Sequence, residues 1–319
     1  MRTITIIAGP TAVGKTKFAI EAAKVLDGEI VSCDSMQLYK YMDIGSAKPT
    51  SEEMAQVKHH LVDIIDPSQP FSVAQYQTMA KNAINEIFEK SKIPIISGGT
   101  GLYVNSLIYD MDFGGGNVDT QLRSDLLKEA EEKGTSELYN RLVRLDPDAA
   151  QRIHPNNTKK LIRALEAAIS GQKIKDFKNC TEKCKDYDIN FIILTRNRDE
   201  LYDRINKRVD LLVESGLFEE VKALLNRGLT EQDISMKGIG YKEVIASLRG
   251  DCSKDDSIAL IKKNTRHFAK RQITWFKRYN EATWLNISDY ISDDEALGEL
   301  IRWLKNKYKF TAKATDRII

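Results

Sequence analysis

The stretch IIAGPTAVGKT, residues 6–16, decides the fold. It fits the pattern GxxxxGK[ST], with an apolar strand pattern before it and a helical pattern after it, from Lys15 to Leu26. Glycines let backbone N–H groups turn toward an anion, and the start of the helix adds partial positive charge. We therefore predict a di- or triphosphate site formed by Gly9, Pro10, Thr11, Ala12, Val13, Gly14, Lys15 and Thr16, with the Thr16 hydroxyl as a ligand of Mg²⁺.

Around this loop, strand-like and helix-like patterns alternate. Apolar strand patterns occupy residues 4–9, 28–35, 59–66 and 93–99, with helical patterns at 15–26 and 72–92. Strands separated by helices imply a parallel sheet that helices cover on both faces. A strand pattern returns at 189–198, and residues 282–288 add a late one. The fold expected is therefore α/β: a P-loop-containing parallel sheet flanked by helices.

Between these strands, the triple glycine at 114–116 interrupts the pattern and resembles a hinge. A charged helical segment without a good strand follows it. We therefore expect a catalytic core made of residues 1–113 and 188–319, interrupted by an inserted helical domain at 114–187. The lysine-rich end, from residue 306 onward, is expected to be a frayed tail.

The composition is that of an ordinary globular chain of 319 residues, 42% hydrophobic and 29% charged. No run approaches 18 apolar residues, so no membrane span is expected. Cleavage of the first residues as a signal peptide would remove the phosphate loop, so we expect a cytoplasmic protein. The four cysteines form no CxxC pair and are expected to be reduced thiols rather than metal ligands.

The net charge of +2 says little about nucleic acid, but the distribution of charge is uneven. From Ser257 to Asn280 there is no acidic residue, and seven Lys or Arg fall between Lys262 and Arg278. On a helix, an arc of about 60° would hold Lys263, Arg266, Lys270 and Lys277, with Ile261, Phe268 and Trp275 on the buried side. A solvated charged face is the alternative, but such faces usually mix both signs. We expect phosphate contacts to RNA here.

Polar residues follow two of the predicted strands. Asp34 ends the second strand pattern, and SGGTGLY, residues 97–103, ends the fourth. Ligands of parallel sheets bind at the carboxyl ends of strands, so both segments are expected to border the phosphate loop. The alternatives are that Asp34 caps a helix and that the glycines form only a tight turn.

The phosphate loop alone does not identify the molecule whose phosphate it binds. The candidates for a second Mg²⁺ ligand, Asp34 and Asp63, do not follow a run of four large apolar residues, and no guanine-reading NKxD motif is present. A small-molecule kinase and an RNA-binding NTPase switch both remain open at this point. The kinase leaves the acid-free helix unexplained, and the switch lacks a recognisable base-reading motif.

Seven ordered motifs, running from Gly9 to Phe276, together resemble the tRNA dimethylallyltransferase family: GPTAVGKT, DSMQLYKYMDIGSAKP, HHLVDI, GGTGLY, IRALE, KGIGYKE and TRHFAKRQITWF. The resemblance implies transfer of a dimethylallyl group from dimethylallyl diphosphate to N6 of adenosine 37, in tRNAs that read codons beginning with U. It implies Mg²⁺ as cofactor and the anticodon stem-loop as partner. The chain lacks the C-terminal zinc-finger region of some members, which indicates a bacterial-type enzyme, and we expect a monomer.

The resemblance also implies roles for individual residues. Asp34 would be the general base, Lys15 and Thr16 would hold the leaving diphosphate, Arg163 would lie near the diphosphate, and Thr100 near the target base. The residues expected to contact tRNA are Asp34, Ser35, Met36, Gln37, Tyr39, Thr100, Arg123, Lys159, Lys160, Arg163, Lys270, Arg271 and Gln272. From the residues alone, Arg123 and Arg163 fit solvated helix faces equally well. A prenyltransferase acting on free adenine nucleotides shares the core chemistry and is a further alternative.

Overall fold

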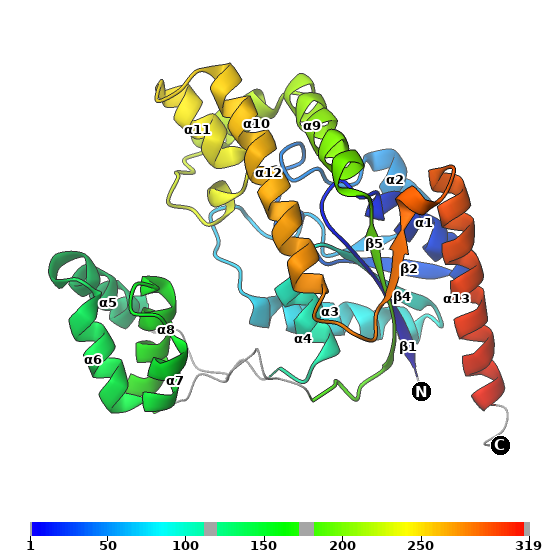
Figure 1. Ribbon diagram of the computed structural model, residues 1–319, viewed down its shortest axis with the longest axis horizontal. Helices are drawn as coiled ribbons and strands as arrows, with labels where there is room; N and C mark the ends of the chain where they lie inside the picture. The colour runs from blue at the N-terminus through cyan, green and yellow to red at the C-terminus, as the bar shows by residue number, and fades with distance from the viewer. Residues whose placement is uncertain (1, 112–119, 172–181, 316–319) are drawn as a thin grey trace. The chain divides into compact units, whose positions relative to one another are not determined.

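The computed structural model describes residues 2–111, 120–171 and 182–315 (Figure 1). The chain forms two compact units, one made of residues 1–109 and 183–319 and the other of residues 110–182. The triple glycine that we expect to act as a hinge lies outside the described residues.

The first unit is built on a six-stranded parallel sheet in the order β3-β2-β4-β1-β5-β6, which confirms the predicted α/β fold. The strands are β1 (Thr3–Ala8), β2 (Gly28–Ser32), β3 (His59–His60), β4 (Ile93–Gly98), β5 (Asp188–Thr195) and β6 (Thr283–Asn286). Its helices are α1 (Lys15–Leu26), α2 (Ser51–Gln56), α3 (Val73–Glu89), α4 (Gly101–Ile108), α9 (Arg198–Glu214), α10 (Leu217–Asn226), α11 (Tyr241–Arg249), α12 (Lys254–Phe276) and α13 (Asp293–Thr315), with 3₁₀ turns at Ser235–Lys237 and Ile287–Asp289.

Side chains alternate between the two faces of the sheet along each strand, and other elements pack on both faces and bury them. On β1, Ile4 and Ile6 pack in one apolar cluster with Ile84 of α3. Ile7 faces the opposite way and packs in a second cluster with Phe18 of α1. This two-sided burial explains why the strand patterns in the sequence are continuously apolar.

The third strand is much shorter than the pattern at 59–66 predicts. Parallel pairing with β2 stops at His60. Leu61 and Asp63 adopt positive φ angles of 61° and 57°, which break the extended backbone. The amides of Asp63 and Ile64 then donate to the carbonyls of Gln37 and Leu38, so this segment braces the loop after β2 instead of extending the sheet.

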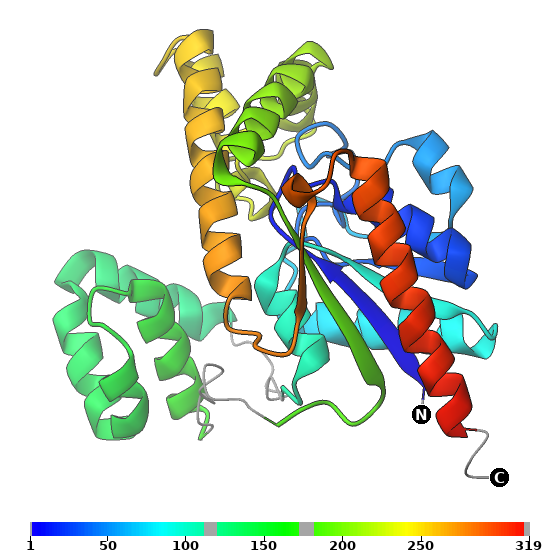
Figure 2. The ribbon, with the colours of Figure 1, turned by 45° about the vertical axis from the view of Figure 1, so that its right-hand side comes forward.

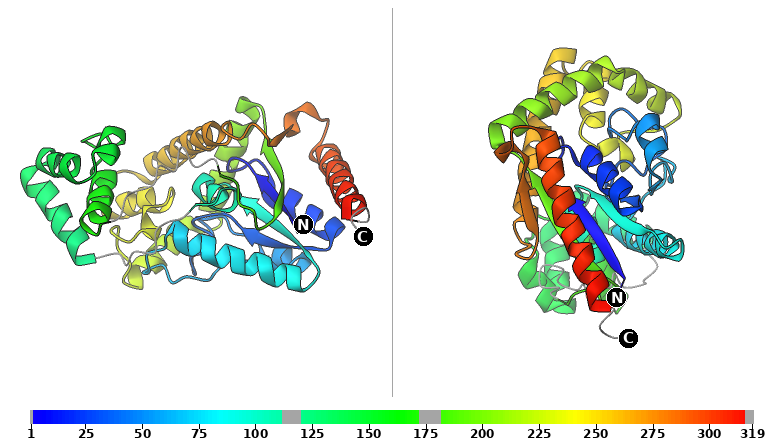
Figure 3. Two further views of the ribbon diagram at one scale, coloured as in Figure 1. Left: turned by 90° about the horizontal axis from the view of Figure 1, so that it is seen from below. Right: turned by 90° about the vertical axis from the view of Figure 1, so that its right-hand side faces the viewer.

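The expectation of a frayed tail from residue 306 is wrong as far as Thr315, because α13 continues to that residue. Figures 2 and 3 show α13 running beside β1 on one face of the sheet. The hydroxyls of Tyr308 and Thr5 share a hydrogen bond of 2.8 Å, which attaches this helix to β1. Thr5 and Tyr308 are 303 positions apart, so a local sequence pattern could not predict this hydrogen bond.

The second unit is a small helical bundle with its own core. Its helices are α5 (Thr120–Lys133), α6 (Thr135–Leu145), α7 (Pro147–Arg152) and α8 (Thr158–Ile169). Leu138 and Leu142 of α6 pack with Leu161 and Leu165 of α8. Throughout the described residues of both units, no helix is long and apolar enough to cross a membrane.

Candidate functional site

The phosphate loop joins β1 to α1 and turns its backbone amides inward. Gly14, which precedes α1, has a φ of 110°, and Ala12 has a φ of 62°. Turns of this hand in succession aim consecutive N–H groups toward one point and form an anion-binding concavity. A Cβ on Gly9 would lie 2.5 Å from the carbonyl oxygen of Leu194, so only glycine lets the loop leave β1 beside β5.

Two arginines hold the loop from its outer side. Arg204 Nε donates to the carbonyl of Ala12 at 3.0 Å, and Arg196 Nε donates to the carbonyl of Val13 at 3.1 Å. Arg196 is buried, and its guanidinium also binds both carboxylate oxygens of Asp293 at 2.7 Å. These bonds occupy loop carbonyls, so the loop presents N–H groups rather than carbonyl oxygens to the pocket.

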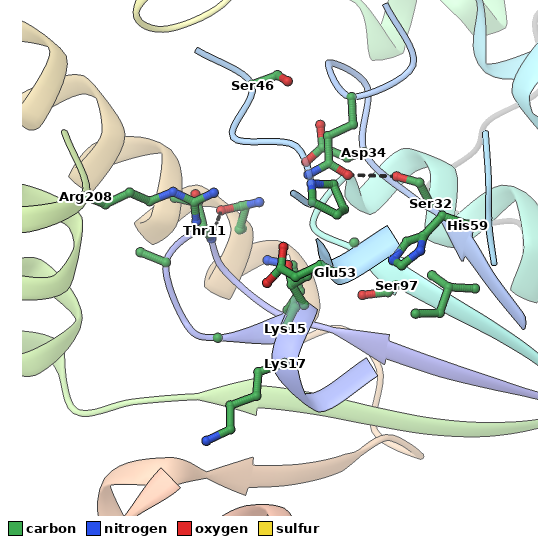
Figure 4. A pocket seen from close by; sticks show the side chains of 18 of the residues that line it. Thr11, Lys15, Lys17, Ser32, Asp34, Ser46, Glu53, His59, Ser97 and Arg208 are labelled. Carbon is green, nitrogen blue, oxygen red and sulfur yellow. Dashed lines mark hydrogen bonds between the residues drawn. The ribbon is translucent and has the colours of Figure 1, made fainter. Parts of the chain in front are cut away.

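Two half-buried cations, Lys15 and Arg208, border this pocket. Lys15 Nζ donates to the carbonyl of Pro10 at 2.8 Å, and burial, opposed by Asp34, lowers the pKa of Lys15 to about 8. Burial also lowers the pKa of Arg208, which reaches from α9 toward the loop beside Thr11 (Figure 4). Among the described residues, Arg208 forms one hydrogen bond and no ion pair. Its remaining donors are therefore available to an anionic ligand.

A glutamine from the basic helix joins two loops of the site. Gln272 Oε1 accepts the amide of Thr11 at 2.9 Å, and Gln272 Nε2 donates to the carbonyl of Gly99 at 2.9 Å. Gln272 is buried. Its amide is thus already bonded at both ends, and it positions the phosphate loop against the loop after β4.

The segments that follow β2 and β4 meet beside the phosphate loop, as expected for segments at the carboxyl ends of neighbouring parallel strands. Asp34 Oδ1 accepts the amide of Met36 at 2.9 Å, a local turn that leaves Oδ2 available. Thr100 Oγ1 accepts the amide of Ser35 at 3.0 Å. Gln37 accepts from the Ser32 hydroxyl at 3.0 Å.

The pocket enclosed by these segments has a volume of about 260 Å³ (Figure 4). Of the residues expected to bind diphosphate or tRNA, it is bordered by Thr11, Ala12, Gly14, Lys15, Thr16, Asp34, Gln37 and Gln272. It is also bordered by Ser97 and Gly98, from the segment expected beside the phosphate loop, and by Phe268, expected on the buried side of the basic helix. The pocket residues to which the sequence analysis gave no ligand role are Lys17, Ile30, Ser32, Ser46, Pro49, Glu53, His59 and Arg208. Arg208 is the most consequential of these, because it supplies a second half-buried positive charge.

Some expected tRNA contacts occupy other environments. Tyr39 is only 2% exposed and packs in the apolar core, where it cannot stack on a base as placed. Met36 is half-buried and packs against that same core. Ser35 and Thr100 bond each other rather than border the pocket. These residues therefore support the conformation of the two loops and do not line the pocket.

The acid-free segment does form a helix, α12, but its buried face differs from the expected one. Ile261, Ala269, Gln272 and Phe276 are buried, whereas Phe268 is half-buried at the pocket and Trp275 is half-buried against Gly101. On the outer side, Lys263, Lys270, Arg271 and Lys277 are exposed. Two basic side chains have partners on α9: Lys262 pairs with Asp210, and Arg266 donates to Asn206.

The remaining expected residues belong to the second unit. Lys159, Lys160 and Arg163 are exposed on α8. Arg123 forms hydrogen bonds of 2.7–3.0 Å to both carboxylate oxygens of Glu166, which ties α5 to α8. Within the first unit, the arginine that borders the pocket is Arg208.

Comparisons with known proteins identify the family of this chain. The family model described as IPP transferase matches residues 37–279. A tRNA dimethylallyltransferase of Alkaliphilus oremlandii is 53% identical over 290 residues, which cover 91% of this chain and 93% of that protein.

Two solved structures extend the likeness to the fold. The full-length tRNA isopentenylpyrophosphate transferase of Bacillus halodurans has a TM-score of 0.74 and 42% identity, covering 99% of this chain and 100% of that one. A eukaryotic dimethylallyltransferase, described as acting on tRNA, has a TM-score of 0.84 and 28% identity, covering 98% of this chain and 80% of that one. The chain therefore belongs to the IPP transferase family.

Proposed function

We propose that this protein is a tRNA dimethylallyltransferase that transfers the dimethylallyl group of dimethylallyl diphosphate to N6 of adenosine 37. The products are N6-isopentenyladenosine in tRNA and diphosphate. The observation that carries the proposal is the joint placement, in one pocket, of a phosphate loop, two half-buried cations and the carboxylate of Asp34. Membership of the family and the names of the relatives support the same activity.

The leaving group is where negative charge grows during the reaction. As the bond from C1 of the dimethylallyl group to the diphosphate oxygen breaks, both bonding electrons stay on the diphosphate. Lys15, Arg208 and the loop amides provide positive charge and N–H donors fixed in advance, and such preorganised groups stabilise a transition state most effectively in a water-poor site. We infer that Arg208 binds the diphosphate, and Arg163 of the second unit remains a proposed contact near it.

The nucleophile is the exocyclic amine of adenine, which must lose one proton as N6 bonds to C1. Asp34 borders the pocket, with Oδ2 left available by the local turn. We propose that Asp34 accepts this proton. General bases of this kind contribute roughly 10²- to 10⁴-fold to rate.

Mg²⁺ fits the donor set, because Mg²⁺ prefers oxygen ligands and usually binds through one or two protein groups together with substrate phosphates. The Thr16 hydroxyl and the Asp34 carboxylate both border the pocket. We propose that Thr16 holds the ion, which when bound neutralises charge on the diphosphate.

The tRNA is proposed to lie along the exposed basic side of α12, where Lys270 and Arg271 would contact phosphates. Lys159, Lys160, Arg163 and Arg123 of the second unit remain proposed contacts. Gln37 at the pocket is the proposed reader of the adenine edge, since amide side chains can form paired hydrogen bonds with adenine. We also propose that the enzyme is a monomer and that it acts in the cytoplasm, where its proposed tRNA substrate is found.

The activity itself is tested by incubating the protein with Mg²⁺, labelled dimethylallyl diphosphate and unmodified tRNA. We expect label in tRNA that reads a codon beginning with U, and none when adenosine 37 is replaced. Label in AMP or ADP would instead identify an adenylate isopentenyltransferase. Phosphate transfer from ATP without prenylation would identify a small-molecule kinase.

Replacing Asp34 with Asn removes the proton acceptor with little change in shape. We expect turnover to fall by about 10²- to 10⁴-fold, with tRNA affinity changed by only a few-fold. Single-turnover rates and filter binding measure the two quantities separately. A large loss of tRNA affinity at normal turnover would contradict the role of general base.

The pKa of Lys15, near 8, predicts how diphosphate affinity depends on pH. Lys15 is charged below this pKa and neutral above it, so its contribution to affinity is present at pH 7 and lost toward pH 9.5. We expect the ratio of affinities between wild type and Lys15→Met to fall roughly tenfold for each pH unit above the pKa.

Calorimetric titration with inorganic diphosphate measures this ratio. The titration of diphosphate itself affects both proteins and cancels. A ratio that stays constant from pH 7 to 9.5 would show that Lys15 does not titrate in this range.

Lys270→Ala should weaken tRNA binding similarly for different tRNAs and reduce the slope of log affinity against log salt by about one. The matched control is Lys305→Ala, which removes an exposed lysine from α13, a helix outside the proposed interface. Equal salt slopes for wild type and Lys270→Ala would remove this part of α12 from the interface.

A further inference from the structure

The carboxylate of Glu220, on α10, binds a loop that lies far from it in sequence. It accepts the backbone amides of Asp43 and Ile44 at 2.7 Å each and that of Gly45 at 2.9 Å. The hydroxyl of Tyr241 donates to the same carboxylate at 2.9 Å. Among the described residues, no lysine or arginine pairs with Glu220, so three backbone dipoles and one hydroxyl satisfy its charge.

Residues 43–48, which we call the clasped loop, are fixed at further points. A Cβ on Gly45 would lie 2.5–2.7 Å from the ring of Tyr241, so the loop backbone packs directly on this tyrosine. At its other end, the ammonium of Lys48 pairs with both Asp43 and Asp63, and its side chain is 3% exposed. The clasped loop is therefore held at both ends.

One carbonyl of the clasped loop, that of Ala47, binds two side chains that border the pocket. Ala47 has a φ of 49°, a left-handed conformation that is unfavourable for a residue with a Cβ. Its carbonyl accepts Gln37 Nε2 at 3.2 Å and Arg208 Nη2 at 3.4 Å. Strained residues of this kind persist where the surroundings hold them in place.

We propose that Glu220 is a positioning residue for the diphosphate subsite. By fixing the clasped loop it holds the Ala47 carbonyl in place, and this carbonyl orients the guanidinium of Arg208 and the amide of Gln37. The inference deepens the proposed function and rests on it, since it assigns Arg208 to the diphosphate. Neither Glu220 nor Tyr241 borders the pocket, so both act through the clasped loop.

Glu220→Gln is the informative change, because it keeps the size of the side chain but turns one acceptor oxygen into an NH₂ donor that faces backbone N–H groups. We expect the affinity for inorganic diphosphate, measured by calorimetry, to fall about tenfold. Diphosphate binding needs no prenyl transfer. A wild type that binds diphosphate but prenylates no tRNA would therefore refute the proposed function and leave this test intact.

The matched control is Glu243→Gln. Glu243 is also a buried glutamate that accepts a backbone amide, that of Gly240 at 2.8 Å, and a side-chain donor, Asn264 at 2.7 Å. It does not contact the clasped loop through any described hydrogen bond. We expect this variant to lose thermal stability like Glu220→Gln but to keep wild-type diphosphate affinity.

A double-mutant cycle separates positioning from general destabilisation. If Glu220 acts through Arg208, Glu220→Gln should weaken diphosphate binding by less than about twofold in an Arg208→Ala background. The same tenfold loss in both backgrounds would overturn the proposal, and so would wild-type affinity in the single variant. If Glu220→Gln fails to fold, Tyr241→Phe is the variant to test. A loss of diphosphate affinity of about two- to fivefold that disappears in the Arg208→Ala background supports the proposal. An unchanged diphosphate affinity refutes it.

Discussion

The site depends on the direction in which the phosphate loop points its peptide groups. A loop that offered carbonyl oxygens to the pocket would repel an anion. Arg204 and Arg196 bind the carbonyls of Ala12 and Val13 from outside, and Gln272 accepts the amide of Thr11 from across the pocket. The anion-binding property of eight local residues is therefore stabilised by side chains from the β5–α9 connection, α9 and α12, which come much later in the chain.

Side chains from later helices also hold the other loops of the site, so α9, α10 and α12 are integral parts of the catalytic unit. α12 joins the phosphate loop to the loop after β4 through one buried amide. α10 holds the clasped loop through one carboxylate. Tyr39 and Met42 anchor the loop after β2 in the apolar core, and hydrogen bonds from these helices fix the polar backbone segments around the pocket.

The sequence predicts well what local pattern determines. The phosphate loop, the alternation of strands and helices, the late strand and the helical nature of the acid-free segment all follow from spacing and periodicity. Arg208 was missed because one arginine among the many charges of α9 carries no local signal. The role of Gln272 was missed for a related reason: a polar residue beside Lys270 and Arg271 resembles a surface contact until tertiary packing buries it.

The charges at the pocket favour a highly charged donor. Burial lowers the pKa values of both Lys15 and Arg208, and the positive charge of Arg208 lowers the pKa of Lys15 further. Among the described residues neither cation has a carboxylate partner within ion-pair distance, so Asp34 compensates them only from a distance. A diphosphate would satisfy both cations at once, whereas a neutral ligand would leave them desolvated and unpaired. The free energy gained by pairing these charges is greatest as the diphosphate leaves, which is the step that the proposed transfer must accelerate.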